Sequence, residues 1–144
     1  MIKIDYPPYT PKIRTEKNIE FIFDEVRKQW VALTPEEWVR QNFMQYLIRV
    51  MKYPASLIAV EKSIRLGDIN KRFDLLVYDA DLKPWMLIEC KEMKVSLNQG
   101  VLDQALRYNI NLRVPYIVIT NGMYCYAFTN ENGQFTELST LPSC

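Results

Sequence analysis

The sequence contains no histidine and little cysteine or glycine. Without histidine, the chain cannot form a Ser-His-Asp triad, a histidine general base or a histidine metal site. Any bound metal would therefore need oxygen or sulfur ligands. The three cysteines, Cys90, Cys125 and Cys144, are widely spaced and odd in number, which argues against a disulfide framework or a zinc cluster. They predict reduced thiols in a cytoplasmic protein.

Long apolar runs and a large net charge are also missing. No run approaches the roughly 18 apolar residues that cross a membrane, and the N-terminal residues lack the pattern of a signal peptide. We therefore expect no membrane partner. The net charge is +1, so a nucleic-acid partner would have to be bound by a local basic patch. The sequence has no Walker loop, and we predict no ATPase site.

A chain of 144 residues predicts a single domain. Within it we expect three parts. Residues 1–33 are interpreted as a proline-containing arm followed by a small hairpin, because residues 20–24 and 30–33 favour strands on either side of a polar stretch. Residues 34–129 are predicted to form the core. Residues 130–144 are polar and are predicted to form a C-terminal tail.

The core pattern predicts a mixed α/β fold. Thr34, Pro35 and Glu37 fit the N-cap, first turn and capping-box acid of a helix that ends near Lys52. Asn121 and Gly122 predict a hairpin turn. The expected elements are strands at 57–64, 73–78 and 86–90, a helix at 98–111, and strands at 115–120 and 123–128. Because several strands are apolar on both faces, we predict three layers, with helices on both sides of a central mixed sheet.

Two of these apolar strands each carry a carboxylate. A tight turn between the strands places Asp74 opposite Glu89 and Asp79 opposite Pro84. Opposed side chains on one face of a sheet have Cβ atoms about 4.5–5.5 Å apart. Strand alternation puts Lys91 on the same face as Glu89. A register shift would instead separate the two acids onto opposite faces.

Two carboxylates at this distance repel each other unless a cation or a proton lies between them. Mg²⁺ is a hard ion that accepts a few carboxylates and completes its shell with water and phosphate. We therefore expect Asp74, Glu89 and the main-chain carbonyl of Cys90 as metal ligands, with Lys91 stabilising negative charge on a phosphate. The alternative is that the acids form salt bridges with Arg72 and Lys91 at strand ends.

With Asp74 followed by Glu89-Cys90-Lys91, the segment resembles the PD-(D/E)XK nuclease superfamily. More closely it resembles the N-terminal nuclease domain of type I restriction enzyme R subunits and small proteins built from that domain alone. Residues 34–41, 71–74, 104–108 and 119–122 resemble further motifs of that domain, and the similarity runs from Leu33 to Gly122. One departure is Phe73, since many relatives have proline before the first acid.

The resemblance implies a restriction-endonuclease-like fold and DNA cleavage that depends on Mg²⁺, with Mn²⁺ as a substitute. It implies Asp74 and Glu89 as metal ligands and Lys91 as the catalytic lysine. It also implies that Gln104 and Tyr108 contact the DNA backbone or orient the metal ligands. They share a helix face, and without the resemblance they would be a polar helix edge.

The resemblance further places one acid of the first helix in the active site, which is either Glu36 or Glu37. Glu37 already has a role as the capping-box acid. At about 100° per residue, Glu36 lies nearer the apolar stripe that contains Val39 and Phe43. We therefore predict Glu36 as the acid that points inward and Glu37 as the one that points away.

The expected partners are DNA and other restriction-modification or defence subunits. A nuclease-fold module that binds nucleic acid or a protein partner without cutting is the alternative, and an interaction domain with a decayed site is a third hypothesis. Six basic residues are candidates for a positive surface around the site, and a solvated charged face is the other interpretation. They are Lys62, Arg65, Lys71, Arg72, Lys91 and Lys94.

Overall fold

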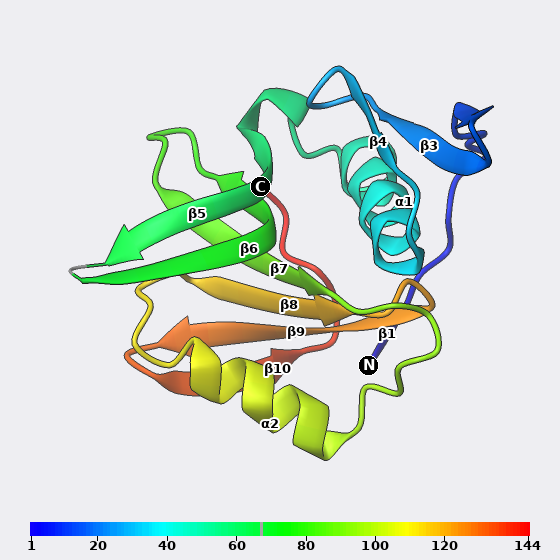
Figure 1. Ribbon diagram of the computed structural model, residues 1–144. Coiled ribbons are helices and arrows are strands. Elements are labelled where there is room, and N and C mark those ends of the chain that lie inside the picture. Colours follow the sequence, from blue (N-terminus) through cyan, green and yellow to red (C-terminus); the bar gives the residue numbers. More distant parts are fainter. Residues whose placement is uncertain (67) are drawn as a thin grey trace.

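The computed structural model describes residues 1–66 and 68–144. Its centre is a seven-stranded mixed sheet in the order β1-β9-β8-β7-β6-β5, with β10 paired to β9 (Figure 1). Strands β7 and β8 are parallel, and the other described pairs are antiparallel. The strands are β1 (Ile2–Lys3), β5 (Ile58–Leu66), β6 (Ile69–Tyr78), β7 (Pro84–Cys90), β8 (Tyr116–Thr120), β9 (Tyr124–Glu131) and β10 (Gln134–Leu138).

Helices α1 (Pro35–Arg49) and α2 (Gln99–Tyr108) lie on opposite faces of this sheet (Figure 1). The expected three-layer fold is therefore confirmed. The Thr34 hydroxyl accepts the Glu37 N–H at 3.0 Å and caps α1 as predicted. Asn98 caps α2 in the same way. In the described part of the chain, no helix has both the length and the apolar character needed to span a membrane.

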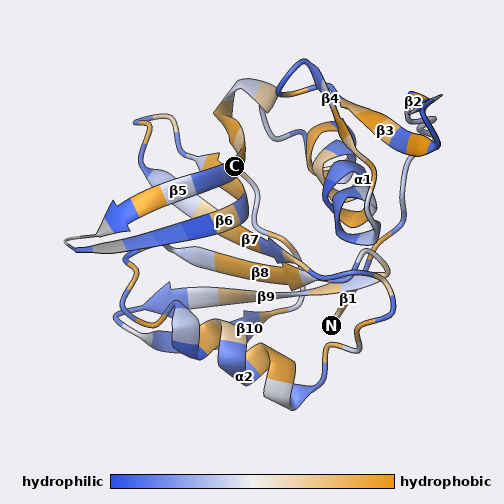
Figure 2. Ribbon diagram, in the orientation of Figure 1, coloured by the Kyte–Doolittle hydropathy of each residue, from blue (hydrophilic) through white to orange (hydrophobic). Residues whose placement is uncertain are grey.

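Each helix contributes to its own apolar core. On the α1 side, Phe43, Met44 and Leu47 pack with strand residues such as Leu75 and Ile88. On the α2 side, the cluster contains Leu102, Ala105, Ile117, Ile119 and Phe128. Figure 2 shows hydrophobic residues along the central strands β7 and β8, with hydrophilic residues along the outer part of β6. A helix and an apolar core therefore cover each face of the strands that carry the candidate site.

The N-terminal part is more ordered than an arm with one hairpin. The predicted hairpin exists as β3 (Ile19–Asp24) and β4 (Gln29–Ala32), but β2 (Ile13–Glu16) adds a third strand. In addition, β1 pairs with β9 in the main sheet. Two short segments expected as arm are thus strands, because pairing to a neighbouring edge satisfies their main-chain groups.

The prediction of a polar C-terminal tail was wrong. Residues Gln134–Leu138 form β10, an edge strand paired with β9. The turn before it has positive φ at Asn132 and Gly133, and the Asn130 side chain accepts the Gly133 N–H. Farther on, Leu141 is buried in the α1-side core. An edge strand with an exposed face can be polar because main-chain hydrogen bonds, rather than burial, hold much of it.

The register of the β6–β7 hairpin matches the prediction over its inner part. Leu75 lies opposite Ile88, and the next two pairs follow in step. The expected pairing of Asp79 with Pro84 was wrong, because a bulge after Val77 places Tyr78 opposite Pro84. The extra residue lies on the turn side of the strand, so it leaves the register towards Asp74 unchanged.

Candidate active site

Asp74 lies where the ladder between β6 and β7 ends. The described pairing stops at Leu75 and Ile88, and the next position in this register would bring Asp74 opposite Glu89. Here the Cys90 N–H donates to Oδ2 of Asp74 at 2.8 Å instead of to a main-chain carbonyl. The carboxylate of Asp74 therefore sits in the opening between the strands, and its side chain is 17% exposed.

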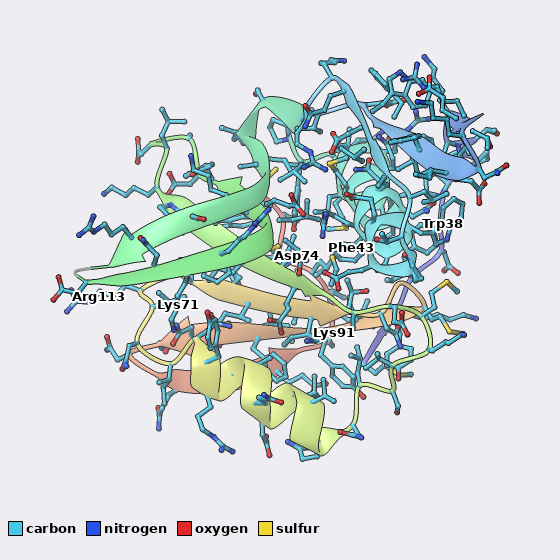
Figure 3. All side chains as sticks on the ribbon, in the orientation of Figure 1. Trp38, Phe43, Lys71, Asp74, Lys91 and Arg113 are labelled. Atoms are coloured by element: carbon cyan, nitrogen blue, oxygen red, sulfur yellow. The ribbon has the colours of Figure 1, made fainter. Side chains whose placement is uncertain are left out.

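Glu89 and Lys91 face the α2 side of the sheet. Both line a cavity of about 260 Å³, which confirms that they share one face. Gln104 and Tyr108 of α2 line the same cavity, together with Val95, Val101 and Ala105. Four of the predicted site residues are thus brought together between β7 and α2. Figure 3 shows Lys91 and Asp74 in the middle of the molecule, between the two helices.

Electrostatic coupling links this cavity to Asp74 and to α1. Burial raises the pKa of Glu89, and the charge of Asp74 raises it further, while Lys91 opposes the shift. Burial also raises the pKa of Glu36, as do the charge of Asp74 and a hydrogen bond to it; Arg40 and Lys91 act against this. Asp74 and Lys91 therefore act on both Glu36 and Glu89.

The predicted orientations of the two helix acids were wrong. Glu36 is 51% exposed, whereas Glu37 is 8% exposed. The Glu37 carboxylate accepts from Arg40 at 2.9 Å, from Arg27 at 3.3 Å and from Gln41 at 3.2 Å. Cationic and amide partners make burial of Glu37 possible. Glu36 nevertheless borders the site, because it is the helix acid that interacts with Asp74.

Arg40 is the main feature that the sequence did not reveal. Its guanidinium contacts four carboxylates, which belong to Glu36 (3.5 Å), Glu37 (2.9 Å), Glu61 (2.9 Å) and Asp74 (3.1 Å). Asp74 does form a salt bridge, as the alternative interpretation expected, but with Arg40 rather than Arg72. The signal in the sequence was the polar series Glu37, Gln41 and Gln45, spaced one helical turn apart in α1, and the structure buries this face of the helix.

Arg40 belongs to a larger, mostly buried network, which we call the arginine cluster. It consists of Asp24, Arg27, Glu37, Arg40, Gln41 and Glu61. Arg27 bonds Asp24 at 2.7 Å, and Gln41 donates to both Asp24 and Glu37. Burial would raise the pKa of Glu61, but the guanidinium groups of Arg40, Arg72 and Arg27 lower it overall. The cluster connects the small N-terminal sheet to α1 and to β5.

The donor atoms near Asp74 fit a hard metal ion. Each carboxylate oxygen has two lone pairs. The Asp74 carboxylate therefore has lone pairs left for a metal ion after it accepts hydrogen bonds from Arg40 and Cys90. The Cys90 carbonyl lies on the same strand edge as its N–H and so faces the opening towards β6. The Cys90 thiol is buried in the α1-side core, and burial raises its pKa well above the ordinary value. The carbonyl, rather than the sulfur, is therefore the atom of Cys90 that suits a hard ion.

The described residues provide two carboxylates for such an ion rather than a larger cluster. Within residues 1–66 and 68–144, no group of three or more histidine, cysteine, aspartate or glutamate side chains is placed to hold a metal. Water and a phosphate would have to complete the coordination shell, which is the usual arrangement for Mg²⁺.

Residues 35–142 match a protein family described as the N terminus of the type I restriction enzyme R protein. The solved structures that resemble the chain include a fragment assigned as an HsdR subunit of a type I restriction enzyme from Vibrio vulnificus YJ016. The sequences are 24% identical, and the TM-score is 0.42. The similarity covers 60% of this chain and 19% of the other. No curated protein matches the chain.

Proposed function

Because this chain belongs to the family of type I restriction enzyme R-protein N-termini, we propose that it is a Mg²⁺-dependent nuclease domain that hydrolyses phosphodiester bonds of DNA. The observation that carries the proposal is that Glu89 and Lys91 line one cavity, while the carboxylate of Asp74 lies at the adjoining strand end, where it accepts the Cys90 N–H and acts on the charge of Glu89. DNA and other restriction-modification subunits are the proposed partners.

Each residue has a role that follows from its place. Asp74, Glu89 and the Cys90 carbonyl would hold the ion, which supplies Lewis-acid activation and a more acidic bound water. The Lys91 ammonium lies beside the carboxylates and stabilises negative charge that develops on the phosphate. Glu36 orients water next to Asp74. The Gln104 amide and the Tyr108 hydroxyl donate hydrogen bonds to phosphate oxygens at the cavity mouth.

A cleavage assay with one isosteric variant tests this proposal. Plasmid and linear DNA are incubated with Mg²⁺ or Mn²⁺, and with EDTA as the metal-free reference. Asp74→Asn keeps the shape of the side chain and removes a charged metal ligand, so cleavage should fall at least about a hundredfold. Asp81→Asn is the matched control, because Asp81 is an exposed acid in the β6–β7 turn.

Equal cleavage by the wild-type protein and Asp74→Asn would contradict the proposal. A second measurement addresses the metal directly. An ion that binds only the native state raises the melting temperature, so Mn²⁺ should stabilise the wild-type protein more than Asp74→Asn. Metal-independent, salt-sensitive DNA binding without any cleavage would identify a module that binds without cutting.

A further inference from the structure

Beyond Asp74, strands β5 and β6 continue as a ribbon that leaves the rest of the sheet. The described pairing of β7 with β6 starts at Leu75, whereas β5 stays paired with β6 from Lys62 onward. Figure 1 shows this ribbon projecting past the ends of β7 and β8. At about 3.3 Å per residue, residues 69–74 cover about 20 Å, the length of roughly six base pairs. We call residues 61–66 and 68–74 the basic ribbon.

The exposed charges of the basic ribbon are mostly positive. Lys62, Arg65 and Arg72 are exposed, and Asp68 is the exposed acid near the tip. The other two acids of the ribbon, Glu61 and Asp74, are held by Arg40. The protein as a whole has a net charge of +1, so this positive charge is a local property. It is the kind of patch that a polyanion recognises.

A further arginine extends the same end of the molecule. Phe73 of the ribbon packs with Leu112 and Val114 of the segment that follows α2. Arg113, which is exposed, lies between them in the chain. Figure 3 shows Lys71 and Arg113 on this side of the molecule. The positive surface therefore comprises both strands of the ribbon and an adjoining loop.

The basic ribbon is connected to the candidate active site on both of its faces. On one face, the Lys71 ammonium bonds the main-chain carbonyl of Tyr108 and lies 4.2 Å from the centroid of its ring. Tyr108 lines the cavity that contains Glu89 and Lys91. On the other face, Arg72 bonds Glu61 at 2.8 Å, and Glu61 is joined through Arg40 to Asp74. A polyanion bound along the ribbon would therefore lead directly to the site.

We propose that the basic ribbon is an arm that binds duplex DNA beside the position of cleavage. A two-stranded ribbon fits the major groove of B-DNA, where both of its edges can reach phosphates. Its aromatic residue, Phe73, is buried, so the ribbon presents no ring on which unpaired bases could stack. The choice of DNA as the ligand rests on the proposed function. The inference itself concerns binding, which does not require cleavage. The contrasting explanation is that the charges only protect the sheet edge against pairing with other chains.

The test compares two charge-neutralising double variants. Lys62→Gln with Arg65→Gln removes two exposed charges from the basic ribbon. Lys3→Gln with Lys83→Gln removes two exposed lysines elsewhere, in β1 and in the β6–β7 turn. Fluorescence anisotropy measures binding of a labelled duplex of about 20 base pairs, in EDTA, between about 50 and 200 mM salt. Melting curves confirm that both variants remain folded.

The ribbon variant should bind the duplex about ten- to a hundredfold more weakly, because each phosphate contact contributes roughly a factor of ten at about 0.1 M salt. The slope of log K against log salt should become shallower by about two. The control variant should behave like the wild-type protein. Unchanged affinity and slope in the ribbon variant would overturn the inference, as would a wild-type protein without duplex binding.

Binding of a single strand of the same length shows whether the protein prefers duplex DNA to single-stranded DNA. Equal affinity for the single strand, with an equal loss in the ribbon variant, would overturn the assignment to duplex DNA. Because all binding is measured without metal, a protein that binds through the ribbon but never cuts would contradict only the proposed nuclease activity. If the protein cuts DNA and its ribbon variant binds DNA normally, only the proposed role of the basic ribbon would be contradicted.

Discussion

The two sides of Asp74 use charge in opposite ways. Towards α1, the arginine cluster is largely buried, and each of its charges is paired with at least one opposite charge. Towards α2, Glu89 and Lys91 line a cavity, and in the described part of the chain neither forms an ion pair or a hydrogen bond through its side chain. Asp74 is bonded to Arg40 of the first region and acts through its charge on Glu89 of the second.

This difference separates architecture from chemistry. A buried charge whose partners are already protein groups has little capacity left for a ligand, and its removal mainly affects folding. A charge that faces a cavity without such partners is available to a ligand. The cost of removing it from water appears as a shifted pKa, and burial raises the pKa of Glu89 in this way. Substitutions within the arginine cluster should therefore mainly change stability, and substitutions of Glu89 and Lys91 should mainly change activity.

The largest expected effect is that of Arg40→Met. The substitution keeps much of the side-chain volume but leaves Glu37, Glu61 and Asp74 without their shared cation. Loss of one member of a buried ion pair costs about 3–5 kcal/mol. Urea denaturation should show a decrease of this size in the free energy of unfolding. Arg72→Met is the matched control, because Arg72 is 66% exposed and its loss should cost less than about 1 kcal/mol. Similar losses of stability in the two variants would show that the buried arginine matters no more for folding than the exposed one.

Lys91→Gln should show the reverse behaviour. Removal of a donor that stabilises transition-state charge typically lowers the rate about 10²- to 10³-fold. The free energy of unfolding should change by less than about 0.5 kcal/mol, since Lys91 does not belong to the arginine cluster. Rates of plasmid cleavage and urea denaturation check the two parts. Lys83→Gln serves as the control for loss of one positive charge. A destabilised Lys91→Gln protein would show that the α2 side is structural as well.

Asp24 gives the arginine cluster a defined dependence on pH. Burial would raise the pKa of this fully buried carboxyl, but hydrogen bonds from the Arg27 main chain and from Gln41, with the Arg27 charge, lower it below the ordinary value of 3.8. A carboxyl with a lowered pKa in the folded state stabilises the fold at pH above about 4. That contribution is lost as the pH falls from there through the folded-state pKa.

Asp24→Asn should therefore cost about 1.5–3 kcal/mol at neutral pH, the value of a hydrogen bond to a charged group. It should also flatten the acid limb of the stability curve. Urea denaturation between neutral pH and about pH 3 measures both effects. A variant that lost stability with acid as steeply as the wild-type protein would show that Asp24 is not the group responsible.

Local rules predicted the parts of the fold that depend on neighbouring residues. Thr34 was predicted as an N-cap and Asn98 as the start of a helix, and both cap their helices. Such caps are predictable because they use the N–H group three residues ahead. The register at Leu75 and Ile88 followed from strand alternation and a short turn. The same alternation brought Glu89 and Lys91 to one face, which the cavity between β7 and α2 confirms.

The arginine cluster could not be predicted in this way, because its members come from separate parts of the chain. Asp24 is the last residue of β3, Arg40 lies in α1 and Glu61 lies in β5. No sequence spacing shows that these segments meet. The predicted orientations of Glu36 and Glu37 were reversed for the same reason. The helical argument assumed that the inward face is apolar, whereas part of it is polar and is filled by partners from other elements.

Glu36→Gln has the smallest expected effect on stability and offers the finest comparison, with its neighbour Glu37→Gln as the matched variant. Glu36 is half-exposed and its contact with Arg40 is long, at 3.5 Å, so its loss should change the free energy of unfolding by less than about 0.5 kcal/mol. Glu37 is buried among Arg27, Arg40 and Gln41, and its neutralisation should cost about 1.5–3 kcal/mol. Cleavage by folded protein should show the opposite order, because Glu36 interacts with Asp74. A Glu37→Gln variant that keeps its stability but loses cleavage would move the catalytic acid to Glu37.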